Sequence, residues 1–357
     1  MSEISFKELL YSSGEILMIR FAHTQADSSE LRIGGADRCP EPGAGEVLVQ
    51  IAASYVAPYI RYICDPQTTY ETPERPFTPG TDAIGKVLET SAGVSSVREG
   101  DMVFADLFID GGWDGQRGEA AFAGNFALSA SAPKLLAKWR NGTFASHIVL
   151  PAECVTDVAP ALAKASAETL TRLGWFGTAL GALDRGGFEA GQHVAVLGAS
   201  GQLGSSVVLL ALSLGASKVT CVGRNLERMA PLRALGDRVE LALEAPAGTQ
   251  LVVSAADGDS AAMIEHAAAG LNRNGSVVIL ASPATPPKAA GLVTRSISIV
   301  GSFWFPRDVP GRLVRMIADG TLDLSLIRAH TFELSKVNDA LSTALQLPPL
   351  EQVVLVP

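Results

Sequence analysis

The sequence has few cysteines, and they are too far apart to form a metal-binding or disulfide framework. The four are Cys39, Cys64, Cys154 and Cys221, and none belongs to a Cys-x-x-Cys pair. Structural zinc sites and small disulfide-bonded folds both depend on closely spaced cysteines. The pattern therefore argues against both and predicts buried cysteines that behave as small apolar residues.

Long apolar runs are also missing. The longest lies around residues 207–214, and a membrane helix needs about 20 consecutive apolar residues. The opening stretch, MSEISFKELLYSSGE, carries acidic residues and lacks the apolar core of a signal peptide. We therefore expect a cytoplasmic protein without a membrane partner.

Positive charge is in deficit across the chain. The formal net charge is −9 and the calculated pI is about 5.1, which argues against a nucleic-acid partner but leaves room for a local basic pocket. The 357 residues are too many for one small core and suit two domains.

The most informative stretch is HVAVLGASGQLG, residues 193–204. The run VAVL predicts a buried strand, and SSVVLLALSLG, residues 205–215, predicts a helix. Between them, Gly198 permits a tight turn, Gly201 allows close approach of a pyrophosphate, and Gly204 lets helix and strand pack closely. The helix N-terminus offers free N–H groups and a positive dipole end. The spacing Gly-x-x-Gly-x-x-Gly differs from the usual Gly-x-Gly-x-x-Gly, so an ordinary strand-to-helix turn is the alternative.

The next strand, residues 218–223, predicts which nucleotide binds. An acidic residue at its end binds the ribose 2′-hydroxyl of NAD, whereas an arginine suits a 2′-phosphate. This chain has Gly223-Arg224-Asn225 there, with Arg228 one turn later. The pattern favours NADPH over NADH. The alternative is that Arg224 is a solvated surface side chain.

The remaining patterns divide the chain into a β-rich first part and an alternating second part. Short strand patterns recur from residue 15 to residue 150, and strands alternate with helices after residue 193, as a doubly wound parallel sheet requires. Residues 106–136 read as a loop or lid. Helices are expected at 161–182, at 310–318 with a stop at Gly320, and at 335–345 with Ser335 as N-cap. A last strand at 352–356 is expected to return to the N-terminal domain.

Several motifs together resemble the medium-chain dehydrogenase/reductase superfamily, which contains zinc alcohol dehydrogenases and zinc-free quinone oxidoreductases. They are PEPGAGEVLVQIAAS, PGTDAIGKVLE, VREGDMVFA, GTFASHIVLP, VLGASGQLG, VGRN, GSFWFPRD and QVVLVP. The resemblance implies an α/β fold class, with a GroES-like β-rich catalytic domain and a Rossmann doubly wound parallel-sheet domain. The expected boundaries are 1–160 and 305–357 for the first, and 161–304 for the second, which binds NADP.

The chain departs from the zinc-dependent members at their metal ligands. The cysteine position falls on Ala57, the histidine position on Thr81, and the third position near Gly174. These residues cannot form a zinc ligand set, so we expect no metal. Hydrogen-bond donors must then polarise the substrate oxygen.

The first candidate donor is Tyr59. It lies in VAPYIR, which resembles the Asp-Pro-Tyr-Met-Arg stretch of zinc-free double-bond reductases and overlaps the proton-relay position of zinc alcohol dehydrogenases. A phenol donates hydrogen bonds at neutral pH. Tyr55, Thr81 and Asp82 are the further catalytic candidates. Each of the four has a structural alternative, as a packed aromatic or a satisfied buried polar group.

The resemblance also implies the cofactor-lining residues. They are Thr178, Gly198, Ala199, Ser200, Gly201, Gln202, Leu203, Gly204, Gly223, Arg224, Asn225, Ser254, Ala255, Ala281, Ser282, Ser302 and Phe303. Residues 293–303 resemble the edge strand through which relatives pair their sheets, which implies a homodimer.

Taken together, the sequence predicts a zinc-independent, NADPH-dependent oxidoreductase that transfers hydride to the C=C bond of a small, hydrophobic enone or quinone. A zinc-free carbonyl reductase or alcohol dehydrogenase is the first alternative. A catalytically silent NADPH-binding protein is the second, and Ala57 would fit it.

Overall fold

The structure is a computed structural model that describes residues 19–110, 119–128, 132–288 and 291–357. It divides into two compact units. The first contains the chain up to Thr171 with residues 329–346 and 352–357, and the second contains residues 172–328 and 347–351. Among the described residues, no helix is long and apolar enough to cross a membrane.

The first unit is built on an antiparallel sheet in the order β16-β17-β3-β4-β5-β9, with β8 also paired to β3. The strands are β3 (Glu46–Tyr55), β4 (Ala83–Thr90), β5 (Met102–Ala105), β8 (His147–Pro151), β9 (Val155–Asp157), β16 (Arg328–Glu333) and β17 (Glu351–Val356). Inward-facing residues of β3, β4 and β5 form its core, including Val47, Val49, Val87 and Val103. The predicted return of the tail is confirmed, because β17 pairs with β3 through Val354 and Tyr55.

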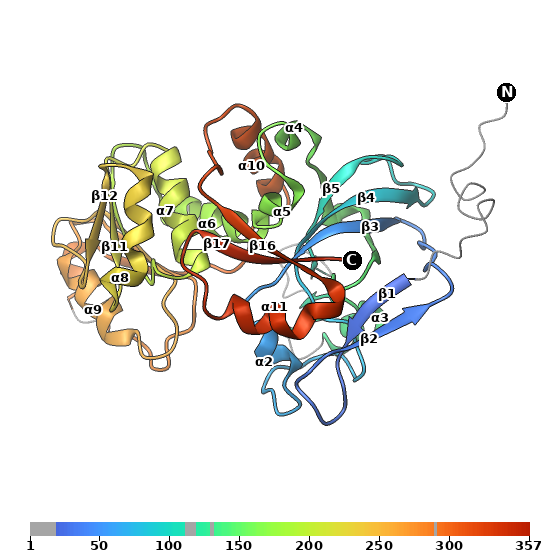
Figure 1. The fold of residues 1–357 in the computed structure, drawn as a ribbon. Helices are drawn as coiled ribbons and strands as arrows, with labels where there is room; N and C mark the ends of the chain where they lie inside the picture. The colour runs from blue at the N-terminus through green and yellow to red at the C-terminus, as the bar shows by residue number, and fades with distance from the viewer. Residues whose placement is uncertain (1–18, 111–118, 129–131, 289–290) are drawn as a thin grey trace. The chain divides into compact units, whose positions relative to one another are not determined.

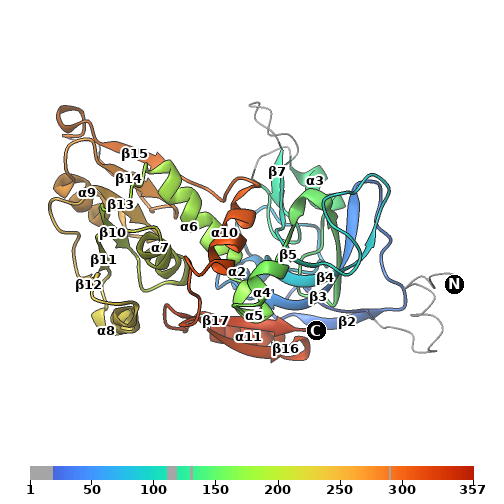
Figure 2. The same cartoon turned by 90° about the horizontal axis from the view of Figure 1, so that it is seen from above.

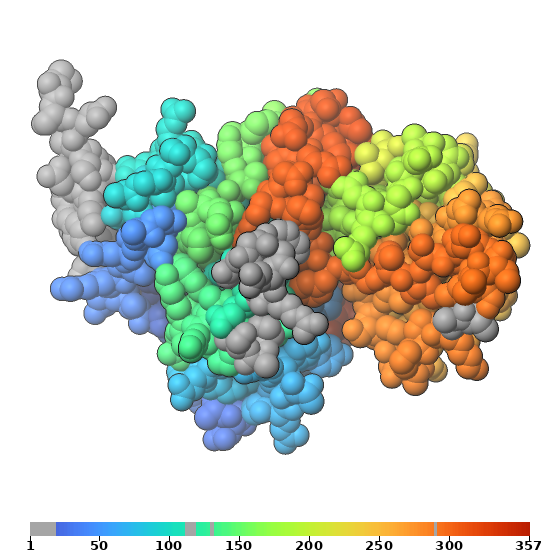
Figure 3. All heavy atoms as spheres, turned by 180° about the vertical axis from the view of Figure 1, so that it is seen from behind, coloured from blue at the N-terminus to red at the C-terminus, as the bar shows by residue number. Residues whose placement is uncertain are grey.

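Smaller elements complete the first unit. A hairpin of β1 (Ile19–His23) and β2 (Arg32–Ala36) joins the segment before β8 through a bridge between Phe21 and Ala145. In the space-filling view of Figure 3, blue residues from the early part of the chain lie beside green ones. The helical pieces are α2 (Ile60–Cys64), α3 (Pro133–Lys138), η1 (Ala152–Cys154), α4 (Ala159–Leu162), α5 (Ala167–Leu170), η4 (Leu334–Lys336) and α11 (Val337–Ala344).

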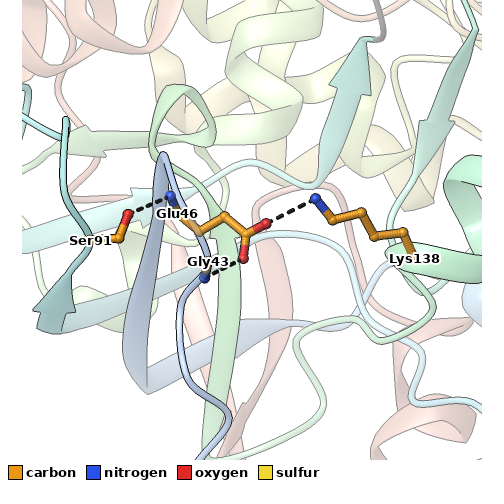
Figure 4. A network of polar contacts seen from close by, with 4 residues as sticks. All are labelled: Gly43, Glu46, Ser91 and Lys138. Atoms are coloured by element: carbon orange, nitrogen blue, oxygen red, sulfur yellow. Dashed lines mark hydrogen bonds and ion pairs between the residues drawn. The ribbon is translucent and has the colours of Figure 1, made fainter.

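Glu46 fixes the turn that leads into β3 (Figure 4). Its carboxylate accepts the backbone N–H of Gly43 at 2.9 Å and pairs with Lys138 Nζ of α3 at 3.0 Å. Its own backbone N–H donates to the Ser91 hydroxyl at 3.0 Å. One residue thus ties the turn, the end of β4 and α3 together.

The second unit contains a six-stranded parallel sheet in the order β12-β11-β10-β13-β14-β15 (Figures 1 and 2). The strands are β10 (His193–Leu197), β11 (Lys218–Val222), β12 (Val239–Ala242), β13 (Leu251–Ser254), β14 (Ser276–Ile279) and β15 (Ser298–Gly301). The helices are α6 (Leu173–Arg185), α7 (Gln202–Ser213), α8 (Leu226–Met229), η2 (Ala230–Leu235), α9 (Ala261–Gly270), η3 (Val293–Arg295) and α10 (Val309–Ala318). The expected doubly wound sheet is confirmed.

Several local expectations were wrong. Residues 161–182 form no single helix, because Ser166 caps a new short helix at Thr169 N and α6 begins only at Leu173. Residues 106–136 contain the β6 (Phe108–Asp110) and β7 (Ala120–Phe122) pair and α3, while residues 111–118 and 129–131 of that segment lie outside the described residues.

Two further differences concern the C-terminal third. Ser335 is not an N-cap, since its hydroxyl donates to Glu333 and α11 starts at Val337. Residues 305–328 group with the second unit, where Arg312 of α10 pairs with Asp184 of α6 at 2.6 Å. The helix stop at Gly320 is confirmed by its φ of +83°.

The turn between β10 and α7 depends on two glycines. Gly198 has a φ of +76°, in the left-handed region that residues with a Cβ rarely adopt. Gly204 lies in the first turn of α7, where a Cβ would clash with the Gly198 carbonyl oxygen and lie 2.9 Å from the Cα of Ala199. Strand, turn and helix can approach this closely only while both positions lack a side chain.

Gly204→Ala should therefore lower the free energy of unfolding by about 2 kcal/mol or more, because the methyl group meets backbone atoms that cannot yield locally. Gly301→Ala in β15 is the matched control, since a Cβ there meets nothing within 4 Å. Urea denaturation of both variants measures the effect. Equal stability of the two would contradict the close contact.

Candidate functional site

The second unit presents a helix N-terminus at the end of its central strand. Helix α7 begins at Gln202, and its N-cap, Gly201, is exposed and offers no side-chain cap. The first-turn N–H groups of a helix lack intrahelical partners. With a bare glycine in front of them, these groups can bind an anion.

The carboxyl ends of four parallel strands meet at the same edge. Gly198 follows β10, Ser254 ends β13, and the remaining predicted residues Ala255, Ala281, Ser282, Ser302 and Phe303 follow β13, β14 and β15. Ser254 is fully buried, and its hydroxyl oxygen has no hydrogen-bond partner among the described residues. Open α/β sheets bind ligands at this edge, so the arrangement fits a dinucleotide.

The end of β11 carries the predicted phosphate-recognition residues. Arg224 is exposed, and its guanidinium has no hydrogen bond or ion pair among the described residues. Asn225 is the N-cap of α8, where its side-chain oxygen accepts the backbone N–H of Arg228 at 3.0 Å. Arg228 itself donates to the carbonyl of Leu347 at 3.1 Å. Arg224 is thus available for a ligand, while Asn225 has a structural task.

Thr178, predicted to face the cofactor, lies in α6 and is 5% exposed. Its hydroxyl donates to the Gly174 carbonyl one turn earlier, at 2.9 Å. The oxygen can still accept a hydrogen bond, so its cofactor contact stays a prediction.

Sequence reasoning missed Arg172, a fully buried arginine in the second unit. Its Nη2 donates to the Gln202 carbonyl and the Ser205 hydroxyl, both at 2.6 Å, and to the Pro349 carbonyl at 2.8 Å. Its Nε donates to Ser206 at 3.0 Å. The guanidinium therefore stands against the first turn of α7. A lone arginine in front of an apolar helix pattern is the only sequence signal for it.

The first unit gathers the four predicted catalytic residues around the start of β4. The Tyr55 N–H donates to the Asp82 carbonyl at 2.8 Å. Thr81 and Asp82 are 1% and 4% exposed, and Thr81 Oγ1 and Asp82 Oδ1 lack hydrogen-bond partners among the described residues. Tyr59 precedes α2 and packs edge-on against Phe126, with ring centroids 6.2 Å apart.

Burial favours the protonated form of two of these groups. It raises the pKa of the Asp82 carboxyl well above its usual value, and the charge of nearby Asp106 raises it further. Burial likewise raises the pKa of the Tyr59 phenol, with Asp82 and Tyr55 adding to the shift. Both side chains are therefore biased toward forms that donate a hydrogen bond.

Two neighbours of this cluster were not predicted. Asn125 is fully buried, its amide nitrogen donates to the Gly80 carbonyl at 2.7 Å, and its oxygen lacks a partner among the described residues. Asp106 is 4% exposed and accepts the Phe108 N–H at 2.9 Å. Both lie in residues 106–136, where sequence patterning gave only a loop.

The positions of zinc ligands in relatives hold a buried alanine, Ala57, together with Thr81 and Gly174. Within the ranges that the structure describes, no three His, Cys, Asp or Glu side chains gather in a way that could hold a metal ion. The expectation of a metal-free site stays a prediction.

Asp82→Asn should make the protein's stability less dependent on pH. The folded-state pKa of the Asp82 carboxyl is raised above its usual value near 3.8. The stability that the protonated carboxyl contributes is therefore fully present below pH 3.8 and is lost as the pH rises through the folded-state pKa. Each unit of elevation corresponds to about 1.4 kcal/mol. The melting temperature of the variant, relative to that of the wild type, should therefore be higher at pH 9 than at pH 5. Asp37→Asn, at an exposed position, is the control, and a constant difference for Asp82→Asn would contradict the assignment.

Comparison with known proteins agrees with this geometry. Residues 43–160 match the family model for the alcohol dehydrogenase GroES-like domain. The chain is similar to the 2-methylene-furan-3-one reductase of Solanum lycopersicum, with 29% identity over 61% of this chain and 50% of the relative. It is also similar to the NADPH-dependent alkenal/one oxidoreductase, chloroplastic, of Arabidopsis thaliana, with 26% identity over 85% of this chain and 70% of the relative. The match thus spans only half of the tomato protein.

A solved structure shows the same fold. It is a protein of Sinorhizobium meliloti, described as a zinc-binding dehydrogenase and bound to NADP, with a TM-score of 0.75 and 19% identity. The alignment covers 95% of this chain and 99% of the other. The chain therefore contains an alcohol dehydrogenase GroES-like domain at residues 43–160, and its glycine turn and parallel sheet give it the fold of the solved medium-chain dehydrogenases.

Proposed function

We propose that this protein is an NADPH-dependent, zinc-independent reductase of conjugated C=C bonds, acting on a small, hydrophobic enone, enal or quinone. The observation that carries the proposal is the pair of buried, partnerless oxygens on Thr81 and Asp82 beside the phenol of Tyr59. The names of the tomato and Arabidopsis relatives support the choice of an enone-type substrate.

The second unit supplies residues that fit the cofactor. The N–H groups behind Gly201 would hold the pyrophosphate, and Arg224 would bind the 2′-phosphate through its planar guanidinium. Buried Ser254 would direct its hydroxyl to the same edge of the sheet. The bound cofactor supplies a hydride, and the chain positions it.

The first unit supplies the hydrogen-bond donors. Tyr59 and protonated Asp82 donate to the substrate carbonyl oxygen, which withdraws electron density from the conjugated β-carbon. When hydride bonds to that carbon, the C=C electron pair moves toward the carbonyl and the oxygen gains negative charge. The same donors stabilise this charge, and a proton then bonds to the α-carbon. The enone, one hydride and one proton together give the saturated ketone.

Two finer assignments belong to the same proposal. Strand β15 is last in the order of the parallel sheet, and an edge strand can pair with a second chain. We therefore infer a homodimer formed along β15. We also place the protein in the cytoplasm.

Product identification after incubation with NADPH and a conjugated enone tests the reaction. A saturated ketone is expected. An allylic alcohol would instead indicate carbonyl reduction, which Tyr59 at the relay position would permit. Saturable NADPH binding without turnover over a panel of enones and quinones would favour a silent nucleotide-binding protein.

Tyr59→Phe should lower kcat/KM for the enone by about 10- to 100-fold, because it removes a donor to the developing oxyanion. Tyr62→Phe is the matched control, since Tyr62 is 61% exposed on the short helix α2 that directly follows Tyr59. Steady-state kinetics compare the two variants. An unchanged rate in Tyr59→Phe would leave the phenol with a packing role only.

Arg224→Glu should reverse cofactor preference, with KM for NADPH rising at least about tenfold and use of NADH improving, because the carboxylate repels a 2′-phosphate and accepts a ribose 2′-hydroxyl. Arg233→Glu makes the same charge change at another exposed arginine of the second unit. Identical ratios of NADPH to NADH activity in both variants would refute the assignment of Arg224.

A further inference from the structure

The first unit contains a pocket of about 580 Å³ that none of Tyr55, Tyr59, Thr81 and Asp82 lines. It lies between the β1–β2 hairpin and the segments around Phe77 and Ala145. Its volume falls within the range of small-molecule sites, which is about 300–1,000 Å³.

The floor of this pocket is apolar. Ile19 and Phe21 are two residues apart in β1, so both side chains lie on the same side of the strand. Ile19, Phe77 and Ala145 are all at least 94% buried, and all line the pocket. This surface suits a hydrocarbon or aromatic body.

The rim is basic. Arg38, Arg140, His23 and His147 line the pocket, and its lining holds no acidic side chain from the part of the chain that the structure describes. The guanidinium of Arg140 is held in place by the carbonyls of Glu74 and Pro76, at 2.8 and 2.9 Å. Arg38 is exposed without a side-chain partner among the described residues. Two guanidinium groups without a carboxylate partner are unexpected on a chain of net charge −9.

His147 adds a buried polar atom. It is 6% exposed, and its Nε2 lacks a hydrogen-bond partner among the described residues. Burial lowers the pKa of the ring, which favours the neutral form. Its Nδ1 lies 2.9 Å from the Ser146 hydroxyl, whose oxygen also accepts the Arg20 N–H. When Ser146 donates to Nδ1, the ring proton is on Nε2 and His147 is a donor.

We propose that this pocket is a second ligand site, for a small organic carboxylate with an aromatic or short aliphatic body. The apolar floor would take the body. The planar guanidinium groups of Arg38 and Arg140 and the Nε2 of His147 would bind the carboxylate. The Asn141 amide nitrogen is a further donor, because its oxygen already accepts the Thr78 N–H at 3.1 Å.

Isothermal titration of the full chain, saturated with NADP⁺, with 2-naphthoate tests the proposal. We expect a dissociation constant of about 1 mM or below and about tenfold weaker binding of the neutral isostere 2-naphthamide. Arg38→Gln should weaken 2-naphthoate binding about tenfold, whereas Arg98→Gln, at another exposed arginine of the first unit, should not. This readout requires no turnover, so it is independent of the proposed reductase activity.

A second pair of variants locates the bound molecule. Ala36→Trp fills the pocket from its rim and should abolish 2-naphthoate binding, while Ile33→Trp, on the same strand but outside the pocket, should leave it intact. Circular dichroism checks that both variants fold. Equal affinity for 2-naphthoate and 2-naphthamide, or binding that neither Arg38→Gln nor Ala36→Trp changes, would overturn the proposal, as would no binding at 5 mM ligand.

Discussion

The second unit depends on a buried guanidinium. A charged side chain taken out of water is strongly destabilising unless hydrogen bonds compensate it, and Arg172 obtains them from Gln202, Ser205, Ser206 and Pro349. Three of these partners belong to the first turn and a half of α7. The arginine can therefore be buried only when α7 begins where it does, and the glycine turn before it is fixed by the same requirement. Its positive charge adds to the dipole of α7 at the end where an anion would bind.

The first unit contains a buried acidic group, Asp82, instead of a buried cation. Asp82 is buried and its Oδ1 has no hydrogen-bond partner among the described residues, so burial raises the pKa of the carboxyl and favours its protonated form. A protonated carboxyl costs less to bury than a carboxylate and becomes a donor. In the proposed mechanism, stability and chemistry would thereby be linked, since the burial that makes an ionised Asp82 unfavourable would also prepare this side chain to donate to a substrate oxygen.

Local signals predicted much of this, and long-range contacts account for what they missed. Three features could be predicted because each depends on residues that are neighbours in the sequence. They are the glycine turn at 198–204, the alternating strands and helices of the parallel sheet, and strand β17. The single helix expected at 161–182 was wrong because a Ser166 cap outweighs helical propensity. Arg172 and Asn125 could not be assigned, because Arg172 has partners 30 to 177 residues away in the sequence and Asn125 depends on the Gly80 carbonyl 45 residues away. The catalytic roles themselves stay predictions.

Net charge alone does not predict where an anion would bind. A protein with a net charge of −9 repels anions, although at physiological salt this repulsion reaches only about 8 Å, the Debye length. An anion site must therefore overcome the repulsion with nearby positive charges and hydrogen-bond donors. Arg172 stands at the N-terminus of α7, while Arg224 and the arginines of the first-unit pocket have no carboxylate partner within the described residues. Arginines neutralised by acidic neighbours, such as Arg312 with Asp184, cannot serve in this way. Where an acidic protein can bind an anion therefore depends on which arginines are paired with acidic side chains. Only the fold shows this pairing.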